Sequence, residues 1–436
     1  MAERAGILAV RRAARAEARA ITGRRRIGWG LTLLLAATVI SLLMAEVAVR
    51  LLQLPDVRRT GDGIEPRGEV WVDPEWRLPP PRAFRLDPVL LVDHEPYFEA
   101  PVPVAEHAGK QFKFRTSGYG LRRDSEISVA KPPGVIRVLV LGDSQTDGQV
   151  ENDETYPARL EQLMVARGQA VEVLNAGVTG YSPQQEYLWY RERGVQLQPD
   201  LVVLGFYLGN DILDLIENKL DARVIDDEAG TLNPITMPAA WLSLHSRLVL
   251  LAKYASRDER VSAVLERVGL VAPPLVDQDR LARVLRECHG CWLQSGKQAL
   301  LAREYPAAAE GAYGRLDLLV RLLERQVAAG GGRLVVLLIP SKNQVEPQDE
   351  RGDVAKMMRL MNLGESDLHY EDVVRERTLA IVEAAGVAVV DPLPELQFAA
   401  SNGRLYYRRD WHLNPNGNSA LAAILDRALE GMRHEE

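Results

Sequence analysis

Five short apolar runs, each followed by a stretch with helical periodicity, constrain the fold more than any other feature of the chain. The runs lie at 136–141, 171–174, 201–206, 334–339 and 387–391, and the helical stretches include 155–167, 184–193, 313–328, 371–385 and 417–430. Strands that are apolar throughout are buried on both faces, and strands that alternate with helices form parallel sheets. The sequence therefore predicts an α/β three-layer sandwich with a five-stranded parallel sheet over residues 135–434.

The alternation of strand and helix lapses between Asp214 and Ala312. Segments such as 241–254 and 280–303 have helical periodicity, and no apolar run of strand length separates them. We therefore expect a helical insertion after the third strand, at about residues 215–311. Ligands bind outside the carboxyl ends of the strands in open α/β sheets, so such an insertion would lie close to the ligand.

A basic segment followed by an apolar one opens the chain. Residues 1–26 carry eight Arg and two acidic residues, and the nineteen residues 27–45 are uncharged. A helix over 27–50 is long enough to cross a hydrocarbon core of about 30 Å. Because basic residues stay in the cytoplasm, we expect a cytoplasmic tail, a single transmembrane helix and a periplasmic or cell-surface remainder. The alternative is a cleaved signal peptide, but Leu43 and Glu46 disturb its cleavage pattern.

The segment 51–134 is rich in Pro, Arg and Asp and has no sustained periodicity. We interpret it as an extracytoplasmic arm or linker with one short strand at 112–116, where apolar and polar residues alternate. The two cysteines, Cys288 and Cys291, lie inside the predicted insertion. Outside the cytoplasm we expect them to form a disulfide or to remain inert thiols. A zinc site would need further ligands besides His289.

Ser144 follows directly on the first apolar run, within the block Leu141–Thr146 (LGDSQT). A serine at the turn between a buried strand and the next element stands where α/β hydrolytic folds hold a nucleophile. Its hydroxyl is weak at neutral pH and needs an adjacent base and donors for the developing oxyanion. Gly-Asp-Ser alone also forms turns and helix caps, so the assignment depends on the rest of the chain.

Two later blocks can supply the oxyanion donors. The block 175–180 follows the second predicted strand, and the block 208–211 follows the third. Ser144 can give its own backbone N–H, and Gly180 can give a second because a residue without Cβ lets the backbone approach a substrate. The side-chain amide of Asn210 can give a third. Taken singly, Gly180 is equally an ordinary loop glycine, and Asn210 equally belongs to a turn or helix cap.

The base and its orienting carboxylate are predicted at His412 and Asp410. Of the seven histidines, only His412 follows the fifth predicted strand and precedes the last helix. A histidine base takes the serine proton through Nε2, while a carboxylate holds Nδ1–H and stabilises the imidazolium. The alternative interpretation of His412 is a surface-loop histidine capped by its neighbour.

The blocks at Ser144, Gly180, Asn210 and His412 together resemble the SGNH (GDSL) family of esterases and acyltransferases, over roughly residues 135 to 432. The resemblance implies a flavodoxin-like fold and gives each of these residues the role described above. The chain departs from the commonest family pattern, because it has Asp-x-His in place of Asp-x-x-His. This spacing is similar to a variant found in many anchored members and in the alginate acetylation proteins. If a backbone carbonyl orients His412 in place of Asp410, a Ser–His dyad results.

The sequence thus predicts a membrane-anchored serine esterase that acts on O-acyl esters through an acyl-serine intermediate. One alternative is an O-acyltransferase that modifies an exopolysaccharide or cell-envelope glycan, and another is a non-catalytic glycan-binding scaffold. No cofactor is expected, because the sequence has neither a phosphate-binding glycine loop nor clustered metal ligands. The expected partners are an acyl ester or acylated glycan and the lipid bilayer. The acidic remainder of the chain, net charge −7 overall, argues against nucleic acid.

Overall fold

The computed structural model describes most of the chain between residue 83 and the C-terminus and parts of the segment before it. The described residues are 37–48, 51, 57–60, 63–66, 83–87, 89–104, 106–217, 292–346, 358–359, 361–364, 367, 370–408 and 411–434. The chain divides into two compact units, and the larger holds all the described residues from 83 onward. The described parts of the smaller unit are a helix over 37–48, residue 51, β1 (Val57–Thr60) and most of β2 (Gly63–Pro66).

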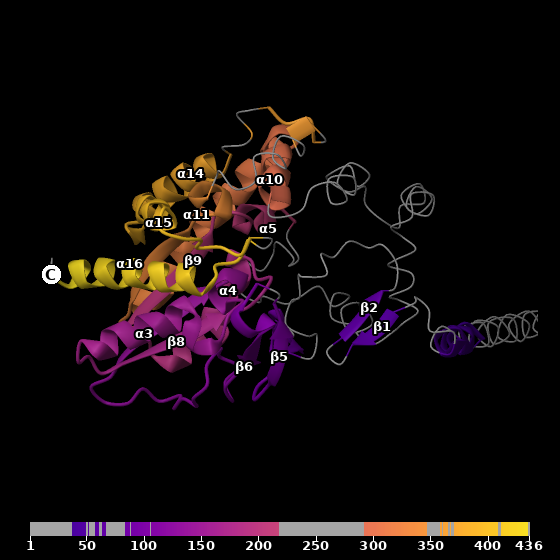
Figure 1. Ribbon diagram of the computed structural model, residues 1–436, viewed down its shortest axis with the longest axis horizontal. Helices are drawn as coiled ribbons and strands as arrows, with labels where there is room; N and C mark the ends of the chain where they lie inside the picture. Colours follow the sequence, from indigo (N-terminus) through magenta and orange to yellow (C-terminus); the bar gives the residue numbers. More distant parts are fainter. Residues whose placement is uncertain are drawn as a thin grey trace, which may run out of the picture. The chain divides into compact units, whose positions relative to one another are not determined.

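A five-stranded sheet forms the centre of the larger unit (Figure 1). Its strands are β7 (Ile136–Gly142), β8 (Val171–Gly177), β9 (Leu201–Tyr207), β10 (Arg333–Ile339) and β11 (Ala388–Val390). They lie in the order β11-β10-β9-β7-β8, and every neighbouring pair is parallel. This is a flavodoxin-like order, in which the chain reverses direction across the sheet at its first strand. The predicted five-stranded parallel sheet is confirmed.

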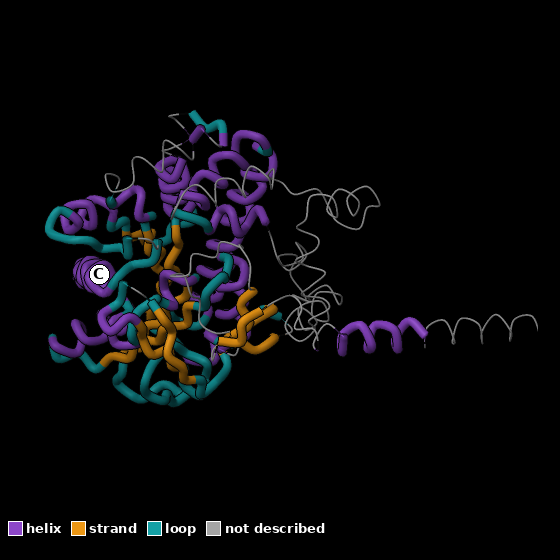
Figure 2. Tube along the Cα trace, turned by 45° about the vertical axis from the view of Figure 1, so that its right-hand side comes forward, coloured by secondary structure: helices purple, strands orange, loops and turns teal. Residues whose placement is uncertain are grey.

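Helices connect the strands, as the periodicity predicts. They are α2 (Ser144–Asp147), α3 (Tyr156–Ala166), α4 (Pro183–Glu192), α5 (Asp211–Glu217), α10 (Trp292–Glu304), α11 (Pro306–Ala329), α12 (Lys342–Val345), α14 (Tyr370–Ala384), α15 (Leu393–Ala400) and α16 (Pro415–His434). Short 3-10 turns lie at η2 (Ala108–Lys110), η3 (Asn152–Glu154) and η4 (Gly194–Leu197). Figure 2 shows how these helices and loops enclose the strands.

The two faces of the sheet bury separate sets of side chains, because successive residues of a strand point to opposite sides. In β7, Leu139 and Leu141 pack with apolar residues of α4, α11 and α14. Val138 and Val140 pack with those of α3, α15 and α16. All four side chains are completely buried. The sheet is therefore covered on both faces, which explains why its strands are apolar without alternation.

Two antiparallel hairpins precede the sheet. They are β3 (Phe84–Asp87) with β4 (Leu91–His94), and β5 (Glu99–Pro103) with β6 (Gln111–Arg115). Phe112 and Phe114 of β6 pack with Val150 and Tyr407, which lie in loops near the carboxyl edge of the sheet. The hairpins therefore share their apolar core with the part of the chain that follows, although the domain boundary at residue 134 stays a prediction.

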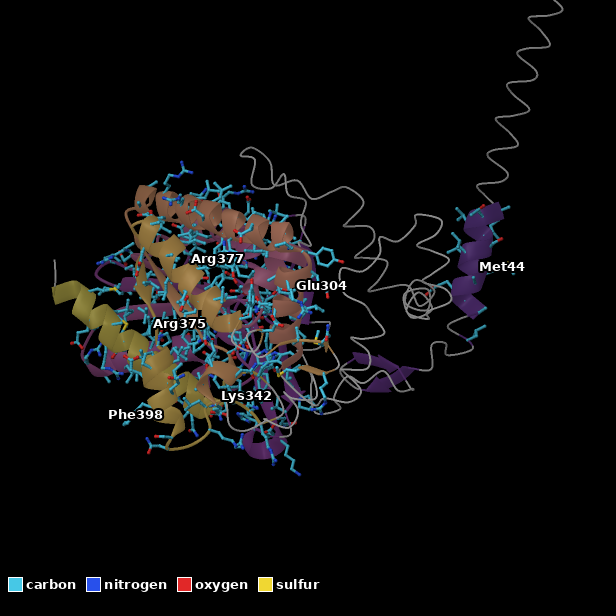
Figure 3. All side chains as sticks on the ribbon, turned by 90° about the horizontal axis from the view of Figure 1, so that it is seen from above. Met44, Glu304, Lys342, Arg375, Arg377 and Phe398 are labelled. Atoms are coloured by element: carbon cyan, nitrogen blue, oxygen red, sulfur yellow. The ribbon has the colours of Figure 1, made fainter. Side chains whose placement is uncertain are left out.

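Two arginines of α14 link this helix to its neighbours (Figure 3). Arg375 pairs with Asp391, which follows β11. Arg377 pairs with Glu310 of α11 at 2.6 Å, and its guanidinium lies over the ring of Tyr313, 3.6 Å from the centroid. An arginine packed flat on an aromatic ring is a stronger contact than an exposed ion pair alone. These contacts hold α14 over the β10–β11 side of the sheet.

Several predicted features fall largely outside the described residues. Of the predicted membrane span 27–50, the described part is a helix over 37–48. Among the described residues, no helix is both long enough and apolar enough to cross a membrane. The predicted insertion at 215–311 is described only at its two ends, and Cys288 and Cys291 lie in the part that is not described.

Candidate active site

Ser144 begins helix α2 directly after β7. The side chain of Asp143 caps this helix by accepting a hydrogen bond of 2.8 Å from the backbone N–H of Gln145. Helix α2 packs closely on the end of β8, since a Cβ at Gly177 would lie 2.4 Å from the backbone nitrogen of Asp147. The serine is thereby held at the carboxyl edge of the sheet, just after β7, which lies between β8 and β9.

The structure brings Ser144 and His412 together, although 268 positions separate them in the sequence. The distance from Ser144 Oγ to His412 Nε2 is 2.8 Å, whereas the distance from Ser144 Oγ to Asp143 Oδ2 is 3.5 Å. When the ring proton is on Nδ1, Nε2 accepts the hydrogen bond of the serine hydroxyl. His412 is buried, so the pair is arranged for transfer of the serine proton to the imidazole.

His412 lies on the second of two short segments that pair with each other. Tyr406 and Leu413 form an antiparallel bridge, and the N–H of Tyr407 donates to the carbonyl of His412 at 3.1 Å. Asp410 lies between the two segments and outside the described residues. Its contact with Nδ1 of His412 therefore stays a prediction, as does the alternative of a Ser–His dyad.

Gly180 and Asn210 follow the two strands that flank β7. Gly180 is exposed and has a φ of +83°, a left-handed conformation that favours glycine. Asn210 is half-buried, and its Nδ2 donates a hydrogen bond of 2.9 Å to Asp214 Oδ2. An amide nitrogen carries a second N–H that can serve an oxyanion. Because adjacent parallel strands end at one edge, both residues stand at the same edge of the sheet as Ser144, and both stay predicted oxyanion donors.

Replacing Asn210 tests its predicted role. Asn210→Ala is expected to lower kcat by about a hundredfold or more with little change in KM, because an oxyanion donor acts mainly in the transition state. Steady-state kinetics on an activated ester measure this effect. Asn402→Ala, at an exposed turn, serves as the matched control and should retain wild-type kcat. A variant with raised KM and unchanged kcat would reassign Asn210 to binding of the ground state.

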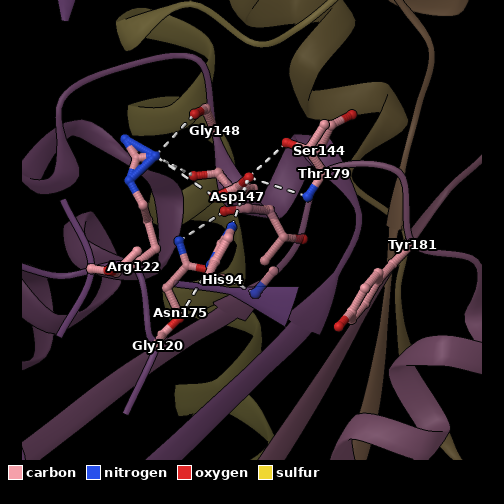
Figure 4. Close-up of polar contacts among 12 residues, drawn as sticks. His94, Gly120, Arg122, Ser144, Asp147, Gly148, Asn175, Thr179 and Tyr181 are labelled. Atoms are coloured by element: carbon pink, nitrogen blue, oxygen red, sulfur yellow. Dashed lines mark hydrogen bonds and ion pairs between the residues drawn. The ribbon is translucent and has the colours of Figure 1, made fainter. Parts of the chain in front are cut away.

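A buried group of polar side chains supports the segment that carries Gly180 (Figure 4). Asp147 Oδ2 accepts hydrogen bonds from the N–H and the hydroxyl of Thr179 at 3.1 and 2.6 Å. His94 Nε2 lies 3.4 Å from the same oxygen, and Arg122 donates to the backbone carbonyl of Asp147 at 3.2 Å. Burial would raise the pKa of Asp147, but the nearby His94 and Arg122 outweigh burial and lower it. The ionised carboxylate thus anchors Thr179, the neighbour of Gly180.

This group is not predicted from the sequence. His94 lies in the predicted arm 51–134, and no sequence pattern connects it with Ser144. The sequence feature that could have indicated this group is Asp147, a carboxylate three positions after Ser144 in a segment that has to lie close to the sheet edge. A buried carboxylate requires partners, and those partners come from the hairpin that precedes the sheet.

Three buried carboxyl groups beside the nucleophile interact with one another. Burial raises the pKa of Asp143 to about 6, while the hydrogen bond from Gln145 and the neighbouring His412 act in the opposite direction. Burial, together with repulsion from Asp143, raises the pKa of Glu186 well above its ordinary value. Burial and repulsion from Glu186 do the same to Asp211. The raised pKa values of Glu186 and Asp211 favour their neutral forms, which limits the negative charge near the place where an oxyanion would form.

The side chains at this edge have an arrangement that suits acyl transfer. Ser144 and His412 are in contact at 2.8 Å, as the predicted nucleophile and base have to be, and the predicted oxyanion donors follow the strands beside them. Within the described part of the chain, no group of three or more His, Cys, Asp or Glu side chains is placed to hold a metal ion.

Comparisons with known proteins relate part of the chain to a family. Residues 288–435 match the family described as an SGNH hydrolase-like domain, acetyltransferase AlgX. This stretch contains His412 and Asp410, whereas Ser144 lies before it. No curated protein matches the chain.

Several solved structures are similar to the chain at low identity. The acetyl xylan esterase AlAXEase is 13% identical with a TM-score of 0.33, over 67% of this chain and 100% of that chain. Axe2, an acetylxylan esterase from Geobacillus stearothermophilus, is 14% identical with a TM-score of 0.34, over 67% and 94%. The lipase/acylhydrolase from Enterococcus faecalis is 11% identical with a TM-score of 0.35, over 68% and 96%. Similarities of this size do not bear on the substrate.

The family match covers the C-terminal part of the fold. The block that contains Ser144 lies before the match, at the carboxyl edge of the same sheet. The serine of that block meets a histidine supplied by the matched part. The C-terminal part of the chain is therefore similar to the SGNH hydrolase-like domain of this family.

Proposed function

We propose that the protein is a membrane-anchored serine esterase that cleaves O-acyl esters through an acyl-Ser144 intermediate. The observation that carries the proposal is the contact of 2.8 Å between Ser144 Oγ and His412 Nε2. A serine hydroxyl becomes an effective nucleophile when a neutral imidazole accepts its proton. The match of residues 288–435 to an SGNH hydrolase-like domain supports ester chemistry at this pair.

The proposed reaction has two halves. In the first, Ser144 Oγ attacks the acyl carbonyl carbon while its proton passes to His412 Nε2, and the N–H groups of Ser144, Gly180 and Asn210 stabilise the oxyanion. The imidazolium then protonates the leaving alcohol, and the acyl group remains on the serine. In the second half, His412 activates water, which attacks the acyl-serine and releases the acid and free Ser144.

A fluorophosphonate probe tests whether the pair is active, since such a probe phosphonylates a serine only when a base activates it. The wild-type protein should be labelled at Ser144, and Ser144→Ala should not. Ser401→Ala removes an exposed serine at the end of α15 and should be labelled as strongly as the wild type. An unlabelled wild type would favour the non-catalytic glycan-binding alternative.

The second candidate function is O-acyl transfer to a hydroxyl of a polysaccharide. It is favoured by the match of residues 288–435 to a family described as containing an acetyltransferase. Hydrolase and transferase use the same nucleophile and differ in the acceptor, which is water in one case and a glycan hydroxyl in the other. Incubation of the purified full chain with an acyl donor and a glycan distinguishes them. Acylated glycan indicates transfer, and free acid alone indicates hydrolysis.

The proposed anchoring rests on the uncharged residues 27–45, and its proposed direction rests on the eight arginines of residues 1–26. A reporter fused after residue 60 is expected to be active only if it folds outside the cytoplasm. In a background without Cys288 and Cys291, a cysteine placed before Arg24 should resist impermeant thiol reagents in intact cells. Ser401→Cys, at an exposed position of the larger unit, should react as the matched control. The opposite labelling pattern would invert the proposed topology.

A further inference from the structure

The side chain of Gln145 binds the main chain on both sides of His412. Its Nε2 donates to the carbonyl of Trp411 at 3.0 Å, and its Oε1 accepts from the N–H of Leu413 at 3.2 Å. We infer that Gln145 is a positioning residue that sets the place of the base relative to the nucleophile. The inference rests on the proposed function, because it concerns the base role of His412.

The orientation of the Gln145 amide is fixed by its partners. The Trp411 carbonyl can only accept a hydrogen bond and the Leu413 N–H can only donate one, so an inverted amide would lose both bonds. Gln145 is 1% exposed, and a buried amide group left without a hydrogen-bond partner is destabilising. The main chain around His412 is therefore held in one register against Gln145.

Gln145 and Ser144 are consecutive residues of helix α2, so they move together. The helix itself is fixed at its start, where Asp143 Oδ1 accepts from the N–H of Gln145 at 2.8 Å. It is fixed again at Thr146, whose carbonyl accepts from Asn175 Nδ2 at 2.8 Å. The nucleophile and the groups that hold the base thus belong to one rigid turn on the sheet edge.

Other contacts hold the paired segments to different parts of the fold. Lys342 Nζ donates to the carbonyl of Arg408 at 2.5 Å, and the hydroxyl of Tyr407 donates to the carbonyl of Gln149 at 3.0 Å. Asn418 of α16 donates to the carbonyl of Leu413 at 3.0 Å. These bonds fix the segments to the sheet and to α16, whereas Gln145 fixes both neighbours of His412 to the turn that carries the nucleophile.

The expected consequence of losing this amide follows from the geometry of proton transfer. Proton transfer depends on the short distance of 2.8 Å between Ser144 Oγ and His412 Nε2. A displacement of about 1 Å can lower the rate about a hundredfold. Gln145→Met keeps the length of the side chain and removes both hydrogen bonds. We expect it to lower kcat by about tenfold to a hundredfold and to leave KM within about twofold, because the amide acts through His412 and not on the substrate.

Two further variants separate positioning from general damage to the fold. Gln145→Asn keeps a buried amide but is too short to reach both Trp411 and Leu413, and it should repeat the loss in kcat. Gln344→Met is the matched control, since Gln344 is also a buried amide that accepts from Ser341 N–H at 3.2 Å and donates to Asp372 at 2.9 Å. It should lower the melting temperature about as much as Gln145→Met while retaining wild-type kcat.

A double-mutant cycle supplies a readout that a purely structural role would not produce. If Gln145 acts through the base, Gln145→Met should change the residual turnover by less than about twofold in a His412→Ala background. The full chain and one activated ester suffice for all variants. An equal loss in both backgrounds would overturn the inference, as would a kcat within about twofold of wild type for both Gln145 variants. A wild-type enzyme without Ser144-dependent turnover would instead refute the proposed function itself.

Discussion

Ser144→Ala is expected to abolish ester turnover and to leave the fold intact. The substitution removes the atom that forms the acyl bond, and the loss of a nucleophile in a serine triad is about four orders of magnitude or more. The hydroxyl lies at the first position of helix α2, where it contacts His412 Nε2 at 2.8 Å and Asp143 Oδ2 at 3.5 Å. We therefore expect a change in the free energy of unfolding within about 1 kcal/mol.

The measurement is turnover of an activated ester by the purified variant, with a thermal melt to verify the fold. Ser401→Ala provides the control, because it removes a serine from an exposed helix end and should retain full activity. A Ser144→Ala protein with activity within tenfold of the wild type would contradict the assignment of the nucleophile.

His412→Ala should be comparably inactive, because the members of a nucleophile–base pair act as a unit. Asp410→Asn then distinguishes a triad from a dyad. If Asp410 holds Nδ1–H, the asparagine stabilises the wrong tautomer and costs several orders of magnitude. If a backbone carbonyl orients His412 instead, Asp410→Asn should cost less than about tenfold.

The contacts of Gln145 sharpen this comparison. They fix the main chain on both sides of His412, yet they have no influence on which ring nitrogen carries the proton. A loss of activity in Asp410→Asn would therefore show that Asp410 controls which ring nitrogen of His412 carries the proton, and not where the ring lies. Rates of both variants on one activated ester decide between triad and dyad, and an active His412→Ala enzyme would defeat both.

The strands of the sheet could be predicted because burial on both faces leaves an uninterrupted apolar run. The end of β8 was harder to predict, since the apolar run stops at Leu174 while the strand continues to Gly177. Asn175 continues the strand because its amide is satisfied inside the fold, donating to the carbonyl of Thr146 at 2.8 Å. Helix α11 begins at Pro306 and not at 313, because its first turns are rich in alanine and show little contrast between faces.

The candidate site was predictable where chemistry restricts the residue type. A nucleophile and a base have to be particular residue types after strand ends, so Ser144 and His412 can be recognised in the sequence as candidates. Gln145 leaves none, because its partners are backbone atoms that every residue possesses. His94 was equally hidden, since its contact with Asp147 joins a hairpin before the sheet to the turn after β7.

The long separation between the nucleophile and its base also affects the order in which the molecule matures. Ser144 and His412 are 268 positions apart, and only α16 follows the histidine as regular structure among the described residues. A nascent chain that leaves the ribosome N-terminus first therefore carries its nucleophile long before its base exists. Contacts of such high sequence separation form late, because the entropy of a long intervening loop has to be overcome first. A chain interrupted before residue 412 would hold Ser144 without its predicted base, so the proposed acyl chemistry requires that synthesis has passed this residue.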